Sequence, residues 1–391
     1  MKLLIIGGTG VLSSAVVNEA LKRNFSITII NRGKKKKTIP QGVEFIEADY
    51  RDKPLMERKL ANKHYDAVID FIVFNKEEIT YSINLLHTIA EQYVFISTAC
   101  VYDTQKSGVK KEEAEKVLKE WDYSVNKWEC EKYLVSEAKK RGFNYTIIRP
   151  CITYDDTRIP YGIMPKYGYH WTFVARVLTG KPILRWNGGN TRWNMMRVED
   201  FAVGVVGVLG NPKAYGEAFN LSGDNAYSWN DVISALHKIL GVNPILFDIT
   251  TEEYIRSYPE KKGEIIGRSF DLVVDNSKIK ELVPSYNTSY SLYEGIEKTI
   301  AAYKKQDYQH GIDWKFDANI DRIITRLCEQ KRIDKSQYKL SFVDYIGTAT
   351  ATDHRLYWLE FHKNNIFIRF CYKLFLLLKT YRKDKRNIKM K

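Results

Sequence analysis

A tyrosine and a lysine four residues apart are the pair in this sequence best suited to acid–base chemistry. Tyr123 and Lys127 lie in the segment WDYSVNKWECEKYL. Residues four apart on a helix share a face, and an ammonium beside a phenol lowers the pKa of that phenol. A tyrosinate accessible near neutral pH can move a proton to or from a substrate hydroxyl. Thr98, in the segment FISTACVYD, can hold a substrate oxygen beside the phenol. Alone, however, the YxxxK spacing is common and is also typical of an ordinary helix face.

A second chemical feature is the glycine cluster in LLIIGGTGVLSS, residues 3–14. A short apolar run before the glycines and helical spacing after them predict a strand-to-helix turn. Such a turn directs backbone N–H groups and the positive end of the helix dipole at an anion. The alternative is a glycine-rich turn that binds no ligand. If a dinucleotide binds, its pyrophosphate contacts should come from Gly7, Thr9, Gly10, Val11 and Leu12, while Ser13 replaces the last packing glycine.

The segments that must position these residues alternate between strand and helix patterns over the first 150 residues. This alternation predicts an α/β fold with a Rossmann-type, doubly wound parallel sheet. The predicted strands are 3–6, 25–33, 43–52, 66–74, 93–98 and 144–150, and the predicted helices are 11–24, 54–63, 77–92 and 126–142.

The remaining sequence predicts two further parts. We expect residues 1–165 to form the dinucleotide-binding domain and residues 166–303 a smaller C-terminal substrate lobe whose segments interleave with the sheet. Residues 304–391 predict an appended helical extension, made of short helices and ending in a basic tail.

Composition places the chain among ordinary globular proteins, with 44% hydrophobic and 28% charged residues. We expect no signal peptide and no membrane-spanning segment, because the apolar runs are too short. The five cysteines are scattered and lack metal-ligand spacing, which favours a cytoplasmic protein without a metal site. Residues 361–391 carry +9 of the total net charge of +14, so the basic character belongs largely to the tail.

Cofactor selectivity should depend on the end of the second strand. An acid there accepts the 2′-OH of NAD, whereas an arginine suits the 2′-phosphate of NADP. The chain has Asn31 and Arg32 and no acid in this turn, so we expect NADP(H) to be favoured over NAD(H). Asp49 can accept a hydrogen bond from the adenine amino group. Further candidate cofactor contacts near strand ends are Tyr50, Phe71 and Pro150.

Several motifs together resemble the extended short-chain dehydrogenase/reductases of the NAD-dependent epimerase/dehydratase type, in an atypical branch. They are GGTGVLS at 7–13, ADYRD at 48–52, STACVY at 97–102, YSVNK at 123–127, RP at 149–150, RVEDFA at 197–202 and DNSKIKELVP at 275–284. The resemblance covers residues 1–303. It implies a nucleotide-sugar substrate, a homodimer, and Thr98, Tyr123 and Lys127 as the catalytic triad.

Departures from the family pattern narrow the expected reaction. Sugar 4,6-dehydratases of this family carry an Asp-Glu pair after the catalytic threonine, where this chain has Ala99 and Cys100. We therefore expect an epimerase or ketoreductase acting in nucleotide-sugar and polysaccharide biosynthesis. Cys100 falls where some epimerases place a cysteine base, and His170 is a candidate partner acid. For both residues we favour the alternative interpretation, a packing residue, and more strongly for His170 than for Cys100. Arg192 and Arg268 are candidate substrate-binding residues.

A binding protein on the same fold is the competing hypothesis, because the DAVIDF-like branch includes chloroplast stem-loop RNA-binding relatives. The intact YxxxK pair and the concentration of charge in one tail make nucleic acid the less favoured partner.

The segment Ile366–Leu378 has ten apolar or aromatic residues interrupted by Arg369, Tyr372 and Lys373. On a helix, Phe367, Phe370, Leu374 and Leu377 would face away from the two basic residues. With the basic run Arg382–Arg386, this pattern is typical of an interfacial helix on an anionic leaflet, which would give peripheral contact with the inner membrane face. The alternative is that the apolar face packs on the protein itself.

Overall fold

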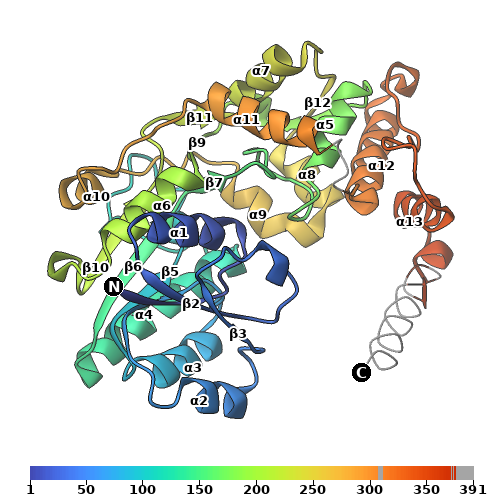
Figure 1. Ribbon diagram of the computed structural model, residues 1–391. Coiled ribbons are helices and arrows are strands. Elements are labelled where there is room, and N and C mark those ends of the chain that lie inside the picture. The colour runs from blue at the N-terminus through green and yellow to red at the C-terminus, as the bar shows by residue number, and fades with distance from the viewer. Residues whose placement is uncertain (307–310, 371, 373, 376–391) are drawn as a thin grey trace.

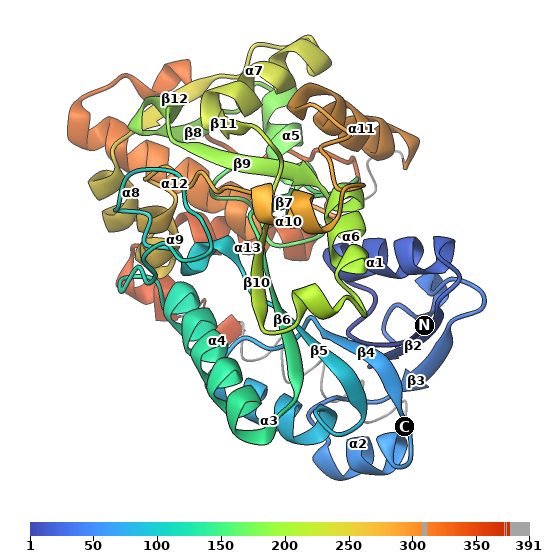
Figure 2. The ribbon, with the colours of Figure 1, turned by 90° about the vertical axis from the view of Figure 1, so that its left-hand side faces the viewer.

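The structure is a computed structural model that describes residues 1–306, 311–370, 372, 374 and 375. A parallel sheet of seven strands forms the central layer of its larger part (Figures 1 and 2). The strand order is β10-β6-β5-β4-β1-β2-β3, and every neighbouring pair is parallel. This order confirms the predicted doubly wound fold. The strands are β1 (Lys2–Ile6), β2 (Ser26–Asn31), β3 (Glu44–Glu47), β4 (Tyr65–Asp70), β5 (Ala90–Ile96), β6 (Asn144–Pro150) and β10 (Glu217–Leu221).

Helices cover both faces of the sheet, because its strands are apolar on both sides. Helices α1 (Val11–Lys22) and α6 (Val198–Gly207) pack in the hydrophobic cluster on one face. The cluster on the other face contains α2 (Lys53–Leu60), α3 (Lys76–Leu86) and α4 (Asp122–Arg141).

The predicted boundary between the helix 77–92 and the strand 93–98 is wrong. The sequence pattern predicts a helix over residues 77–92, but α3 ends at Leu86 and β5 begins at Ala90. Ala90 pairs with Tyr65 of β4, and Gln92 is buried between strands, where its amide donates to Thr146 at 2.8 Å. Pairing with the neighbouring strands therefore overrides the local helical pattern of this segment.

The smaller lobe contains a three-stranded and a two-stranded sheet with helices around them. Its strands are β7 (Ile152–Tyr154), β8 (Ile183–Trp186), β9 (Arg192–Arg197), β11 (Ala226–Ser228) and β12 (Leu246–Ile249). Its helices are α5 (Trp171–Leu178), α7 (Trp229–Leu240), α8 (Thr251–Ser257), α9 (Lys262–Gly267), α10 (Ser277–Leu282) and α11 (Leu292–Lys305). Six short 3-10 helices complete the described chain: Lys36–Thr38, Ala99–Val101, Asn187–Gly189, Pro212–Ala214, Pro259–Lys261 and Lys335–Gln337.

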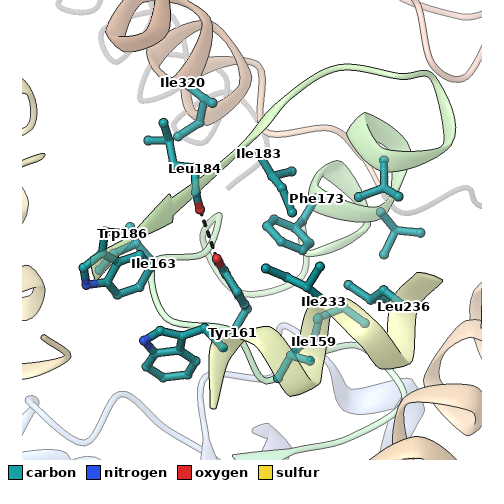
Figure 3. Packing of buried hydrophobic residues seen from close by; sticks show 14 of the residues in the cluster. Ile159, Tyr161, Ile163, Phe173, Ile183, Leu184, Trp186, Ile233, Leu236 and Ile320 are labelled. Carbon is teal, nitrogen blue, oxygen red and sulfur yellow. Dashed lines mark hydrogen bonds between the residues drawn. The ribbon is translucent and has the colours of Figure 1, made fainter. Parts of the chain in front are cut away.

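The core of this lobe is rich in aromatic residues (Figure 3). Tyr161 packs against Phe173 with ring centroids 4.9 Å apart and against Trp186 at 5.9 Å. Its hydroxyl donates to the carbonyl of Leu184 at 3.0 Å, so the buried phenol keeps a hydrogen-bond partner. Ile320 of the C-terminal extension belongs to the same cluster, which joins the lobe to the extension.

The extension begins with a helix longer than the sequence pattern predicts. Helix α12 (Trp314–Lys331) has 18 residues, and α13 (Ala351–Phe361) packs against it. Between α12 and the lobe lie four charged side chains that are fully buried: Arg176, Lys181, Asp317 and Asp321. We refer to these four as the buried ionic cluster.

The tail after α13 is described only in part. Ile368, Tyr372 and Phe375 pack against Leu356 and Leu359 of α13. The exposed apolar side chains of this segment are Ile366, Phe367, Phe370 and Leu374. Lys373, Leu377 and the basic run Arg382–Arg386 lie outside the described residues. Within the described residues, no helix is long and apolar enough to cross a membrane.

Candidate active site

The glycine turn connects β1 to α1 as predicted and is shaped by its positive φ angles. Gly7 has φ +113° and Gly8 has φ +65°, conformations that disfavour other residues. A Cβ on Gly8 would lie 2.4 Å from the Ile29 side chain, so the turn packs closely on β2. Gly10 precedes the first turn of α1 and donates its N–H to Ser13 Oγ at 2.9 Å. Ser13 thus replaces the packing glycine while also fixing the start of the helix.

At the end of β2, the Asn31 side chain is bonded to the glycine turn, whereas the Arg32 side chain is exposed. The Asn31 side chain donates to the carbonyl of Gly7 and accepts from the N–H of Gly33, both at 2.9 Å. Asn31 therefore holds the glycine turn in place. Arg32 is exposed beside it. The Glu47 carboxylate at the end of β3 borders Gly33 and pairs with Lys36 at 3.9 Å.

Asp49 and Tyr50 follow β3 but have different environments. Asp49 is exposed, and its carboxylate accepts the N–H of Arg51 at 3.0 Å. The Tyr50 hydroxyl instead donates to buried Ser82 at 3.0 Å. Its phenol is committed to the protein interior, so a contact with a cofactor there would come from its backbone.

Phe71 and Pro150 lie at the carboxyl ends of β4 and β6. Phe71 borders the glycine turn, since its Cβ lies 3.5 Å from the position that a Cβ on Gly7 would take. Pro150 is buried and pairs with Leu221 of β10. Parallel strands end at one edge of the sheet, where ligands of doubly wound folds bind, and both residues lie along this edge.

Thr98 and Tyr123 meet at this same edge. Thr98 follows β5, is buried, and accepts the N–H of Cys100 at 3.1 Å. Tyr123 lies in the first turn of α4 and is half-buried. Burial raises the pKa of Tyr123, the neighbouring Cys100 adds to this effect, and the side-chain hydrogen bond with Thr98 opposes it. The Tyr123 phenol is therefore protonated at neutral pH and can donate a proton.

Lys127 is held at the edge of the sheet by backbone carbonyls. The buried ammonium donates to the carbonyls of Val73 at 2.6 Å and Ile96 at 2.9 Å, at the ends of β4 and β5. Burial lowers the pKa of Lys127 to about 8. Its expected role beside the Tyr123 phenol stays a prediction, and the described contacts of its ammonium are these two carbonyls and the rings of Phe74 and Phe95.

Cys100 lies near Thr98, Tyr123 and Cys151. Burial raises the pKa of the Cys100 thiol, while Arg268 acts to lower it. Burial and the neighbouring Cys100 also raise the pKa of Cys151, to about 12. Both side chains are thus thiols at neutral pH, which fits packing better than a thiolate base.

His170 is buried at the start of α5, where Nδ1 accepts the N–H of Ile159 at 3.2 Å. Burial and the nearby Arg158 lower the pKa of His170 to about 3. The ring is neutral at physiological pH, so it does not fit the cationic acid that the sequence suggested. It anchors the loop of residues 159–170 instead.

The two candidate substrate-binding arginines differ in location. Arg192 is the first residue of β9; its side chain is exposed and pairs with Asp271 at 2.9 Å. Arg268 follows α9 and lies over the ring of Trp193 at 5.1 Å, and its charge acts on Tyr123, Cys100 and Cys151. The structure therefore brings Arg268, and not Arg192, to the catalytic candidates.

Sequence reasoning missed Arg158, which also reaches this region. Its guanidinium stacks on the ring of Tyr167 at 3.8 Å, and its Nε is buried without a hydrogen-bond partner. The Tyr123 phenol is among the groups that act on its charge. The sequence offers one signal for this residue: Arg158 lies a few residues after the end of β7.

The described residues contain no group of His, Cys, Asp and Glu side chains that could hold a metal ion. The glycine turn, the first turn of α1 and exposed Arg32 fit a dinucleotide, since a helix N-terminus attracts a pyrophosphate and glycine presents no intruding Cβ. The N–H groups of Thr9 and Gly10 are themselves bonded to the Gly7 carbonyl and to Ser13 Oγ.

Residues 3–222 match the NAD dependent epimerase/dehydratase family. The chain belongs to this family. Its curated relatives include the chloroplast stem-loop binding protein of 41 kDa b of Arabidopsis thaliana, which is 26% identical over 74% of this chain and 79% of that protein. They also include the 2′-dehydrokanamycin reductase of Streptomyces kanamyceticus, at 20% identity over 73% of this chain and 80% of the reductase.

A solved structure with the same fold is the UDP-glucuronic acid 4-epimerase of Bacillus cereus in complex with UDP-glucuronic acid and NAD. It superimposes with a TM-score of 0.61 at 20% identity and covers 78% of this chain and all of the epimerase chain. Membership of the family agrees with a nicotinamide cofactor at the glycine turn. The C-terminal extension lies outside the matched residues.

Proposed function

We propose that this protein is an NAD(P)-dependent nucleotide-sugar epimerase or ketoreductase in which Tyr123 is the proton-transferring acid and base. The observation that carries the proposal is the meeting of Thr98 and Tyr123 at the edge of the sheet that also holds the glycine turn. A bound nicotinamide would supply or accept the hydride at the sugar carbon. The intact dinucleotide turn and the family match support this assignment.

The chain's own groups divide the work of proton transfer. Tyr123, whose raised pKa keeps the phenol protonated, donates a proton to a ketone oxygen; the tyrosinate takes one from a hydroxyl. Thr98 positions that oxygen. Lys127, fixed by the Val73 and Ile96 carbonyls, supplies a positive charge at the edge of the sheet. Such a charge favours the tyrosinate once water is excluded.

The proposed cofactor preference is NADP(H) over NAD(H). Exposed Arg32 is available to a 2′-phosphate, whereas the Asn31 amide is engaged by the glycine turn. The Bacillus cereus epimerase is a complex with NAD, so a preference for NAD is the alternative outcome.

Arg268 is the proposed substrate-binding residue, because a guanidinium pairs well with the phosphate oxygens of a nucleotide sugar. Arg268 pairs with Glu264 at 3.4 Å, and its charge acts on Tyr123 and Cys100. We leave Arg192 out of the proposed site, because its guanidinium is exposed and pairs with Asp271 away from these residues. Ala99 and Cys100 provide no carboxylate after Thr98, which disfavours 4,6-dehydration. Epimerisation through Cys100 and His170 requires charge states that their burial opposes, so simple reduction or 4-epimerisation fits better.

The test is to purify the full chain, release any bound nucleotide and identify it by mass, and then screen nucleotide sugars for hydride transfer. Hydride exchange with at least one nucleotide sugar is expected. If no nicotinamide cofactor binds and structured RNA binds tightly at physiological salt, the RNA-binding alternative suggested by the Arabidopsis relative replaces this proposal.

We further propose that the protein acts as a homodimer in the cytoplasm, with a membrane contact through the tail. Sedimentation analysis of the full chain tests the dimer, and a monomer at micromolar concentration would contradict it.

A further inference from the structure

A groove of about 680 Å³ lies at the junction of the smaller lobe and the C-terminal extension. Five cationic side chains line it: Arg256 from α8, Arg322 and Arg326 from α12, and Lys363 and Arg369 from the segment after α13. We call this feature the arginine groove. Its elements follow the family-matched residues 3–222, and Arg322, Arg326, Lys363 and Arg369 belong to the C-terminal extension.

Arg322 is the most deeply placed of these cations, with only 5% of its surface exposed. Its guanidinium donates to three neutral oxygens: the carbonyl of Ser257 at 3.3 Å, the amide oxygen of Asn364 at 3.0 Å, and that of Asn319. Its Nε is buried and has no hydrogen-bond partner among the residues that the structure describes. Burying a guanidinium without a hydrogen-bonded carboxylate is costly, and a bound anion would relieve that cost.

The acids of the groove do not neutralise its arginines. Glu260 pairs with Lys363 at 3.6 Å, and Glu329 pairs with Lys335 outside the groove at 3.6 Å. Glu260 and buried Glu360 act on Arg322 only through space. Four arginines of the groove form no ion pair with any described residue: Arg256, Arg322, Arg326 and Arg369.

We propose that the arginine groove binds a small phosphorylated ligand, distinct from the cofactor and substrate of the catalytic pocket. Guanidinium groups present paired N–H donors that match phosphate oxygens, and several of them together suit a multiply charged group better than a single carboxylate. The groove volume lies in the range of small-molecule sites. A buried arginine at its base favours a compact ligand over an extended nucleic-acid backbone, which exposed cations contact.

The test is calorimetric titration of the full chain with inorganic pyrophosphate, with and without NADP present. We expect one pyrophosphate per chain at a site that NADP does not block. Arg256→Gln combined with Arg326→Gln should weaken this binding by about tenfold or more, because each removes a charge-assisted contact. Both side chains are exposed, so the fold should be unaffected. Arg355→Gln, an equal loss of charge on α13 outside the groove, is the matched control and should bind as the wild type does.

Three results would overturn the proposal: equal pyrophosphate affinity in the double variant and the wild type, an equal loss in Arg355→Gln, or no pyrophosphate binding by the wild type. Binding of a single-stranded RNA oligomer that depends on Arg256 and Arg326 and exceeds pyrophosphate in affinity would also replace it with a nucleic-acid surface. Because the readout is binding to named groove residues, failure here leaves the proposed catalytic function untouched, and failure of that function leaves this site untouched.

Discussion

At the scale of single residues, the proposal rests most directly on the Tyr123 hydroxyl. We expect Tyr123→Phe to lower turnover by about 10²–10⁴-fold, because proton transfer loses its positioned donor. Cofactor affinity should change little, since the phenol ring is retained. Steady-state rates with an active nucleotide sugar and a cofactor titration measure the two effects.

Tyr133→Phe is the matched control for that variant. Tyr133 lies on the same helix, ten residues further along, where its ring faces Lys76 at 5.6 Å. Loss of the Tyr133 hydroxyl should leave turnover unchanged. Wild-type turnover in Tyr123→Phe would remove the tyrosine from the mechanism.

Arg32 decides the proposed cofactor preference. We expect Arg32→Ala to weaken NADP binding by about tenfold or more and to leave NAD binding nearly unchanged, because only NADP carries the 2′-phosphate. Dissociation constants for both cofactors at one salt concentration measure this. Lys34→Ala, a neighbouring exposed cation, controls for nonspecific charge. Tighter binding of NAD than NADP by the wild type would reverse the assignment.

Sequence reasoning located the residues at strand ends but not the directions of their side chains. Gly7, Thr98 and Tyr123 share an edge because parallel strands end together, and the order of strands and helices makes this predictable. The direction of Lys127 depends on carbonyls 54 and 31 residues away, at Val73 and Ile96, which no local pattern encodes. The proximity of Arg268 and Arg158 to Tyr123 likewise arises only when separate segments of the lobe fold over the sheet.

At the scale of elements, local sequence patterns predicted a helix or strand correctly where they agreed with the pairing of strands in the sheet. The predicted strand 144–150 coincides with β6, whereas Ala90–Gln92 were assigned to a helix because the preceding segment has helical spacing. Helix α12 is longer than the short helices that the sequence predicts, and its buried face carries acidic residues. Asp317 and Asp321 suggest a solvated face until their partners on α5 and in its following loop are known.

The buried ionic cluster gives a stability prediction for this pair of elements. Asp321 accepts from Arg176 at 2.9 Å and from Lys181, so Asp321→Asn should cost about 3–5 kcal/mol of unfolding free energy by leaving buried cations undercompensated. Urea denaturation of the full chain measures it. Glu329→Gln, on the exposed side of α12, should cost less than about 1 kcal/mol. Similar losses in the two variants would show that the buried cluster contributes no more than a surface pair.

At the scale of the whole molecule, the tail presents two apolar faces with different surroundings. Tyr372 packs on α13, whereas Phe367 and Phe370 are 74% and 67% exposed. This division combines the two alternatives that the sequence left open. The packed face attaches the segment to the protein, and the exposed face stays available to a membrane surface.

We therefore expect the full chain to sediment with vesicles that contain anionic lipid at low salt, and to be released by high salt. A chain ending at Asn364 and the variant Phe367→Ser/Phe370→Ser should both stay in the supernatant. Vesicles without anionic lipid are the control. If the full chain also remains in the supernatant with anionic vesicles, the tail makes no membrane contact.

The buried ionic cluster has a further consequence during synthesis on the ribosome. Arg176 and Lys181 are translated 136 to 145 residues before the aspartates that neutralise them. At about 5–20 residues per second, the nascent lobe waits roughly 7–29 s for its counter-charges. During that interval its two cations must stay in water, so the core around α5 cannot close. The lobe should therefore acquire protease resistance only after α12 has emerged, although most of its own sequence was finished long before.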